Sequence, residues 1–137
     1  MGLSLVAASR AACREVKVHA LHDPTEGGLA NALWELAQAS EVGLVVHESE
    51  IPRYAESARL AELFEINLLG MIASGALLIA SAASDTSQIL QSLSEVEIEG
   101  KVIGHILEKQ QGLQLLRGEQ STVELPRFDA DEITQIL

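Results

Sequence analysis

The sequence predicts a layered α/β (α+β) domain, and three observations support this fold class. The 137 residues are the size of one ordinary domain, which buries a core without disulfides or metals. Apolar residues recur with a helical period of about 3.6 in some segments and a strand period of about 2 in others, and the two alternate along the chain. Hydrophobic residues make up 47% of the sequence but aromatic residues only 3%, so the core is expected to be aliphatic. Without an internal repeat or a linker, residues 1–137 are expected to form one domain.

One helix is predicted more strongly than the other elements. Over residues 29–41, one stripe of the helical surface holds small and apolar side chains and the opposite side is polar. The stripe consists of Leu29, Ala32, Leu33, Leu36, Ala37 and Ser40. Gly43 is expected to end this helix, because glycine favours the conformation that follows a helix.

Shorter patterns predict the remaining elements in order. Helices are expected over residues 3–14, 54–65, 85–93 and 129–137, the last capped by Asp129. Strands are expected over residues 16–21, 44–48, 76–82, 101–107, 113–117 and 122–125. The 76–82 segment is the most apolar and is expected to be a central strand buried on both faces. Turns at 110–112 and 118–119 predict a hairpin or meander in the last third.

Charge and cysteine content exclude several functional classes. Nine Lys and Arg against twenty Asp and Glu give a net charge of −11, so a nucleic acid would be repelled. The single cysteine, Cys13, excludes an intramolecular disulfide and a multi-cysteine zinc site. No apolar run approaches the ~20 residues that span a membrane, and the N-terminus lacks a signal-peptide pattern. A cytoplasmic protein that binds neither nucleic acid nor membrane is therefore expected.

The segment His22-Asp23-Pro24-Thr25-Glu26-Gly27-Gly28-Leu29 has two interpretations. In the first, Asp23 caps the following helix, Pro24 is its first residue and Glu26 completes a capping box. That interpretation leaves the glycine pair unexplained, since each glycine costs up to ~1 kcal/mol relative to alanine in a helix. In the second, Gly27 and Gly28 leave the main chain bare for a tight turn or for an anionic ligand at the helix N-terminus. Asp23 and Thr25 would then hold a metal or a hydroxyl group.

A second glycine-marked corner lies at residues 70–75, just before the apolar 76–82 segment. It is either a turn into the sheet or a second wall of a ligand cleft, with Ser74 offering a hydroxyl group. His22 is a further candidate because it ends the preceding strand, where α/β sheets bind ligands. The other histidines and Cys13 fit no metal-ligating or catalytic pattern.

Three segments carry a resemblance to a known family: residues 22–46, which begin HDPTEGGL, then GMIASGALLIA at 70–80 and KVIGHI at 101–106. In order and spacing they resemble the C-terminal domain of the AIR synthase-related superfamily, and within it the hydrogenase expression/formation (HypE) branch. The resemblance implies a three-layer α/β/α fold with a mixed sheet, like the PurM C-terminal domain, with partly ferredoxin-like topology.

The resemblance also implies a function. Members of the superfamily use ATP and Mg²⁺, bound mainly by an N-terminal domain, to activate a substrate oxygen by phosphorylation. It implies that Asp23, Thr25, Gly27 and Gly28 face the phosphates or the substrate, with Ser74 and Gly75 as the opposite wall and His22 as a polar contact. It gives this chain no catalytic residue and no metal ligand. The implied partners are an N-terminal ATP-binding domain, a second copy in a homodimer, and other proteins of hydrogenase maturation.

Two departures from the family pattern keep a second interpretation open. The N-terminal ATP-binding domain is absent from the sequence, and residues 133–137 lack the terminal cysteine on which HypE proteins carry a cyano group. The chain alone is therefore expected to have no ATPase activity. The alternative is a non-catalytic binding or assembly module that keeps the fold without the chemistry. In either case an apolar face, in the strand-rich last third or at the cleft, is expected to cause self-association.

Overall fold

The computed structural model describes residues 3–118 and 121–136. It is a mixed α/β structure, as predicted, and it divides into two compact units. Unit 1 comprises the chain up to residue 24 together with residues 74–102, and unit 2 comprises residues 25–73 and 103 onward. Each unit is described by itself. No helix among the described residues is long and apolar enough to cross a membrane.

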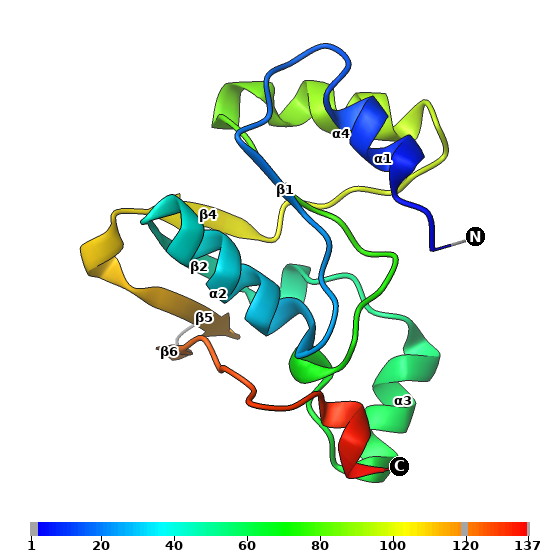
Figure 1. The fold of residues 1–137 in the computed structure, drawn as a ribbon, viewed down its shortest axis with the longest axis vertical. Coiled ribbons are helices and arrows are strands. Elements are labelled where there is room, and N and C mark those ends of the chain that lie inside the picture. Colours follow the sequence, from blue (N-terminus) through cyan, green and yellow to red (C-terminus); the bar gives the residue numbers. More distant parts are fainter. Residues whose placement is uncertain (1–2, 119–120, 137) are drawn as a thin grey trace. The chain divides into compact units, whose positions relative to one another are not determined.

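Unit 1 packs two helices beside a short strand pair. Helices α1 (Val6–Ala12) and α4 (Thr86–Ser94) contact each other, and β1 (Ala20–His22) pairs antiparallel with β3 (Leu78–Ala80) (Figure 1). A single 3₁₀ turn, η3 (Ala83–Asp85), precedes α4. The core is aliphatic, as the composition predicts, and its buried members are Ala8, Ala11, Ala12, Ile89 and Leu93.

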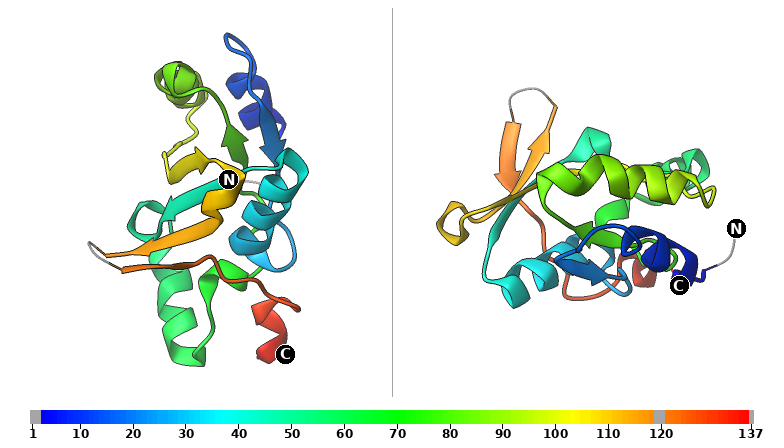
Figure 2. Two further views of the ribbon diagram at one scale, coloured as in Figure 1. Left: turned by 90° about the vertical axis from the view of Figure 1, so that its left-hand side faces the viewer. Right: turned by 90° about the horizontal axis from the view of Figure 1, so that it is seen from above.

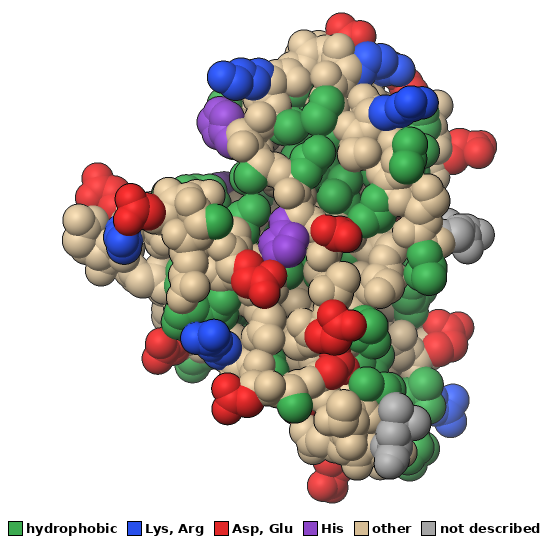
Figure 3. All heavy atoms as spheres, viewed as in Figure 1, with side chains coloured by type: hydrophobic (Ala, Val, Ile, Leu, Met, Phe, Trp, Pro, Cys, Tyr) green, Lys and Arg blue, Asp and Glu red, His purple; other side chains and the backbone are tan. Residues whose placement is uncertain are grey.

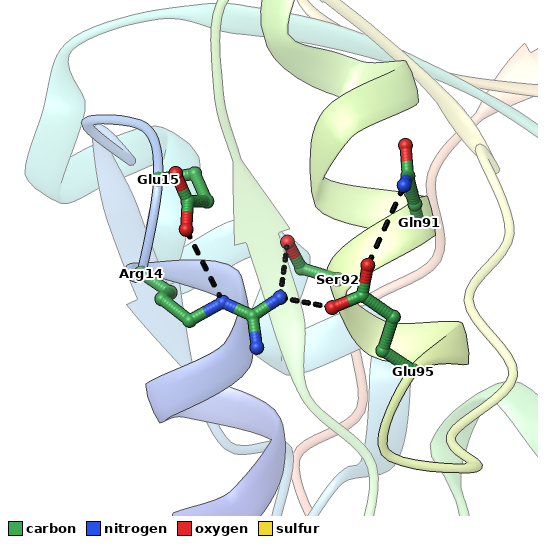
Figure 4. Close-up of polar contacts among 5 residues, drawn as sticks. All are labelled: Arg14, Glu15, Gln91, Ser92 and Glu95. Carbon is green, nitrogen blue, oxygen red and sulfur yellow. Dashed lines mark hydrogen bonds and ion pairs between the residues drawn. The ribbon is translucent and has the colours of Figure 1, made fainter.

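Arg14, which follows α1, ties α1 to α4 (Figure 4). Its guanidinium donates to Ser92 Oγ at 3.5 Å and forms ion pairs with Glu95 and, at 3.5 Å, with Glu15. Gln91 in turn donates to Glu95 at 3.4 Å. The Arg14 side chain is 45% exposed, so solvent limits each of these pairs to under about 1 kcal/mol.

Unit 2 is built on a four-stranded mixed sheet. The strand order is β4 (Gly104–Leu107), β2 (Gly43–His47), β5 (Leu113–Arg117), β6 (Ser121–Glu124). The β2–β5 pair is parallel and the other two pairs are antiparallel. Helix α2 (Gly28–Ser40) covers one face of the sheet (Figures 1 and 2), and four nearly inaccessible side chains of the core are Leu44, Val46, Leu115 and Leu125.

The rest of the described part of unit 2 consists of one further α-helix and four short 3₁₀ segments. Helix α3 (Ala55–Phe64) buries only Ala61. The 3₁₀ segments are η1 (Glu48–Glu50), η2 (Leu68–Gly70), η4 (Lys109–Gln111) and η5 (Glu132–Gln135). The predicted helices over 3–14, 29–41, 54–65 and 85–93 are thus confirmed, each with ends shifted by one to three residues.

The predicted role of the 76–82 segment was wrong. Only Leu78–Ala80 forms a strand, its residues are half-buried, and its one neighbour in the described sheet is β1. The segment is therefore not a central strand buried on both faces. The 16–21 strand is likewise reduced to β1 at Ala20–His22, because β3 offers only three partner residues. An apolar run shows that a segment is buried, but the number of its strand neighbours depends on distant parts of the chain.

The ends of the helices also differ from expectation. Glu41, rather than Gly43, takes the left-handed conformation after α2 (φ 53°), whereas a Cβ on Gly43 would lie 2.5 Å from the carbonyl oxygen of Glu108. At the C-terminus the 3₁₀ helix η5 replaces the predicted helix over 129–137, and Asp131, not Asp129, caps it. Leu137 of that predicted helix and residue 119 of the predicted turn lie outside the described residues.

We predict that Glu65→Gly stabilises the protein. Glu65 ends α3 in the left-handed conformation (φ 55°), which costs an L-residue about 1 kcal/mol or more and costs glycine nothing. The expected gain in unfolding free energy is about 0.5–1 kcal/mol, measured by chemical denaturation. Glu62→Gly, inside the same helix, is the matched control and should cost about 1 kcal/mol. Equal losses for both variants would contradict the strain at Glu65.

Candidate functional site

The glycine pair lies at the start of α2, as predicted, in an unusual conformation. Gly27 is the N-cap with φ 75°, and Gly28, the first helical residue, has φ 65°. The Gly28 N–H donates to the carbonyl oxygen of Thr25 at 3.0 Å, which closes a tight turn ahead of the helix. Side chains other than glycine are strained at these φ values, so the main-chain geometry itself accounts for both glycines.

The predicted capping box does not form. With Asp23 as the N-cap, the helix would begin at Pro24, but it begins at Gly28, four residues later, and no side chain of the N-cap residue Gly27 caps it. Asp23 is exposed and Pro24 is buried in the connection before the turn. The box pattern is present in the sequence, but the turn that ends at Gly27 moves the helix start beyond the reach of Asp23.

Gly28 is also required by a close contact. A Cβ at this position would lie 2.5 Å from the carbonyl oxygen of Met71 and 2.6 Å from that of Leu69. The start of α2 therefore packs directly on the main chain of η2 and the residue that follows it. The structure thus confirms that the glycine pair forms a tight turn. A ligand contact would be a second role for the same residues.

The main-chain N–H of Gly27 is hydrogen-bonded to a buried carboxylate. The Gly27 N–H donates to Oδ2 of Asp131 at 2.9 Å, and Asp131 is only 8% exposed. The other carboxylate oxygen, Oδ1, accepts the N–H of Ile133 at 3.0 Å. An anionic group is therefore already bound where the sequence predicts an anionic ligand. Sequence reasoning missed Asp131, because its partner Gly27 is 104 residues away.

Residues 125–136, which we call the C-terminal segment, form hydrogen bonds and packing contacts with the start of α2 and with η2. The side chain of Asn31 donates to the Phe128 carbonyl oxygen at 2.9 Å and accepts the Phe128 N–H at 3.0 Å. Glu132 accepts the N–H of Asn67 at 2.8 Å. A Cβ on Gly70 would lie 2.6 Å from the Phe128 ring. The start of α2, the η2 turn and the C-terminal segment therefore form one packed cluster, which we call the glycine corner.

Trp34 extends these contacts along α2. Its indole N–H donates to the carbonyl oxygen of Leu125 at 3.2 Å. The guanidinium of Arg127 lies over the Trp34 ring, 5.7 Å from its centre. Leu125 itself is 2% exposed, so the beginning of the C-terminal segment is anchored in the apolar core.

The structure places the other predicted site residues in two groups. Thr25 is exposed and belongs to unit 2 with the glycine pair. His22, Asp23, Ser74 and Gly75 belong to unit 1 and are described apart. There, His22 Nδ1 lies 3.9 Å from the exposed carboxylate of Asp23, Ser74 is exposed, and Gly75 has φ 95°. A Cβ on Gly75 would touch Leu3 at 3.3 Å, which gives this glycine a structural role too.

Acidic side chains outnumber basic ones in this chain, so a bare anion would meet a negatively charged protein. Carboxylates are spread over the face drawn in Figure 3, in line with the net charge of −11, and Asp23 and Glu26 are exposed near the glycine pair in sequence. No group of three His, Cys, Asp or Glu side chains that could hold a metal by itself occurs in residues 3–118 and 121–136.

Comparison with known proteins identifies the family. The family model "AIR synthase related protein, C-terminal domain" matches residues 2–115. The chain belongs to this family. Carbamoyl dehydratase HypE of Cupriavidus necator is 34% identical over 93 residues, which cover 66% of this chain and 26% of the relative. HypE of Escherichia coli is 29% identical over 116 residues, which cover 82% of this chain and 34% of the relative. The chain thus spans about a third or less of these relatives' length.

Solved structures agree with this family assignment. A crystal structure of E. coli HypE superposes with a TM-score of 0.80 at 27% identity, covering 97% of this chain and 42% of that one. A HypE solved in complex with ATP shares the fold at a TM-score of 0.80 and 20% identity, over 91% of this chain and 40% of that one. A HypE solved in a HypE–HypF complex does so at 0.75 and 20% identity, over 80% and 36%.

We predict that Gly28→Ala destabilises the protein by more than Gly118→Ala. Both glycines have φ 65°, but a Cβ on Gly118 meets nothing within 4 Å. The control therefore measures the backbone strain alone, about 1–2 kcal/mol, and Gly28→Ala adds about 1–3 kcal/mol of overpacking against η2. Urea denaturation measures both. Equal losses would show that the contact with Met71 and Leu69 yields without cost.

Proposed function

We propose that this chain is the C-terminal, phosphate-facing domain of an ATP-dependent, HypE-like protein that activates a substrate oxygen by phosphorylation. The observation that carries the proposal is one part of the glycine corner, the N-terminus of α2, where the exposed Thr25 precedes the buried Gly27 and Gly28 in a chain of this family. Relatives of the chain that carry the name carbamoyl dehydratase support the reaction class.

The residues of this chain have defined tasks in the proposed reaction. The Thr25 hydroxyl donates a hydrogen bond to a phosphate or substrate oxygen, and the positive end of the α2 dipole stabilises negative charge there. The exposed Asp23 carboxylate contacts the divalent cation that accompanies the phosphates. Ser74 and Gly75 form a second ligand contact and His22 a further polar one. When bound, ATP supplies the phosphoryl group.

The proposal extends to parts and partners beyond the described chain. An N-terminal ATP-binding domain would hold most of the ATP and Mg²⁺, and the cellular site would be the cytoplasm. The three-layer α/β/α arrangement with partly ferredoxin-like topology belongs to the same proposal. Self-association as a homodimer is supported by Leu60, Leu63 and Phe64, which are 53%, 72% and 47% exposed along α3. Contact with other maturation proteins is proposed by analogy with the HypE of the HypE–HypF complex.

One observation favours the alternative, a binding or assembly module without catalysis. The Gly27 amide, which the catalytic proposal assigns to an anionic ligand, donates to Asp131. A corner closed by its own chain would serve packing alone. The two proposals differ in whether the corner supports ATP turnover when an ATP-binding domain is present.

A chimera tests this difference. In it, residues 1–137 replace the matching C-terminal part of E. coli HypE, to which they are 29% identical over 116 residues. We expect the chimera to hydrolyse ATP faster than the HypE N-terminal part alone, while residues 1–137 alone show no turnover. A folded chimera no faster than that N-terminal part would contradict the catalytic proposal and favour the binding module.

We predict that Thr25→Val in the chimera raises the KM for ATP about tenfold, because a hydrogen bond to a charged oxygen is lost. Thr25 is exposed, and its described contact uses the main chain, so the melting temperature should not change. Thr122→Val, the same replacement at an exposed position of β6, is the matched control and should leave both values unchanged. Identical kinetics for the two variants would remove Thr25 from the site.

A further inference from the structure

We infer that His47 and His105 together bind a divalent transition-metal ion of the Zn²⁺ type on the sheet of unit 2. Both histidines belong to unit 2, and the inference does not depend on the proposed function. Imidazole nitrogen is a ligand for zinc, copper and nickel ions, whereas Mg²⁺ takes oxygen ligands. The ion at this pair is therefore a different one from the Mg²⁺ that accompanies ATP.

Strand pairing brings together two histidines that lie far apart in the sequence. His47 ends β2, His105 lies in β4, and the two strands are neighbours in the sheet (Figure 1). His105 is directly opposite Val45, and Val45 precedes His47 by two residues on its strand. Because side chains alternate between the two faces along a strand, His47 and His105 share one face of the sheet. The buried Leu44 and Val46 point to the other face.

The distance between the two rings suits imidazoles that share one ion. The ring centres of His47 and His105 are 6.1 Å apart. A zinc–nitrogen bond of about 2.0–2.1 Å places a ring centre about 3.2 Å from the ion. Two rings on one ion then lie about 5 Å apart at a tetrahedral angle and about 6.4 Å apart in a straight line. The rings now meet edge to face at 86°, and the exposed His105 is free to turn a nitrogen toward the ion.

The nitrogens of both rings are available for a ligand. Within residues 3–118 and 121–136, neither imidazole forms a hydrogen bond or an ion pair with the protein. His47 is half-buried and His105 is exposed, so an ion from solvent reaches both. The net charge of −11 also attracts cations to the protein. Since no third ligand of the described residues joins the pair, water completes the coordination and the ion exchanges with solvent.

The shared ion has a thermodynamic consequence for the sheet. Two ligands on one scaffold bind more tightly than either alone, because the second acts at a high effective concentration. The two histidines are held together by the pairing of β4 with β2, and β4 is an edge strand of the described sheet. An ion that binds only the folded arrangement stabilises it in proportion to the logarithm of the ion concentration.

Calorimetric titration of the full chain with Zn²⁺ tests the inference. All variants carry Cys13→Ser, because the exposed thiol of Cys13 is itself a zinc ligand. His47→Gln and His105→Gln should each raise the dissociation constant about a hundredfold, since one of two linked ligands is lost. The double variant should be little weaker than either single variant. His19→Gln removes an exposed histidine from unit 1 and should bind zinc like the Cys13→Ser chain.

Urea denaturation gives a second, independent measurement. Zn²⁺ should raise the denaturation midpoint of the Cys13→Ser chain and leave that of His105→Gln in the same background unchanged. Mg²⁺ at the same concentration should shift neither midpoint by way of this pair. His105 is exposed, so His105→Gln is expected to fold and decides the test if His47→Gln does not.

The contradicting results are distinct. Zinc binding that is unchanged in His105→Gln, or that weakens as much in His19→Gln, would overturn the inference. Losses in the two single variants that add up in the double variant would indicate two separate contacts and would overturn the shared ion. The kinetic measurements on Thr25 in the chimera use neither histidine, so the proposed function succeeds or fails separately.

Discussion

The hydrogen bond from the Gly27 amide to the buried carboxylate of Asp131 is the contact on which the glycine corner depends. It joins the beginning of α2 to the end of the chain across 104 residues. The pairing of Asn31 with Phe128 and the contact of Glu132 with Asn67 then follow the same path. One buried carboxylate thereby joins the start of the helix to the C-terminal segment.

Packing alone accounts for the glycine pair. Positive φ angles at Gly27 and Gly28, and the approach of Gly28 to the carbonyl oxygens of Leu69 and Met71, would keep both glycines in the absence of any ligand. Both glycines are buried, and the space that a Cβ would take is filled by the Asn31 side chain at Gly27 and by main-chain oxygens at Gly28. Exposed Thr25 lies directly before this turn. The phosphate contact of the proposed function therefore depends on the exposed Thr25.

The sequence was most informative where structure is local. Helix α2 was predicted well because its apolar stripe is complete within 29–41, and β5 matched its predicted range of 113–117. The 76–82 segment failed because its apolar pattern could not reveal that β1 is its partner. Likewise, Asp23, Pro24 and Glu26 match a capping box, yet the turn closed by Gly28 and Thr25 overrides it. Short-range patterns describe an element, while its neighbours are set by distant contacts.

In the candidate site, too, the sequence revealed the local features but not the contacts between distant residues. The motif HDPTEGGL indicated the family and the glycine corner, since its residues are consecutive. Asp131 carried no signal of its own, because an acidic residue near a chain end is ordinarily exposed. Only the folded arrangement shows that it is buried against Gly27. Sequence reasoning thus located the place for an anion but not the side chain that fills it.

The most direct test follows the main-chain amide of Gly27 by nuclear magnetic resonance in the ¹⁵N-labelled chain during titration with triphosphate and Mg²⁺. If a phosphate group binds at the start of α2, as the proposed function requires, the Gly27 resonance should move with saturation. A ligand that binds while the Gly27 resonance stays unchanged would contradict the proposed site and place the ligand elsewhere on the protein.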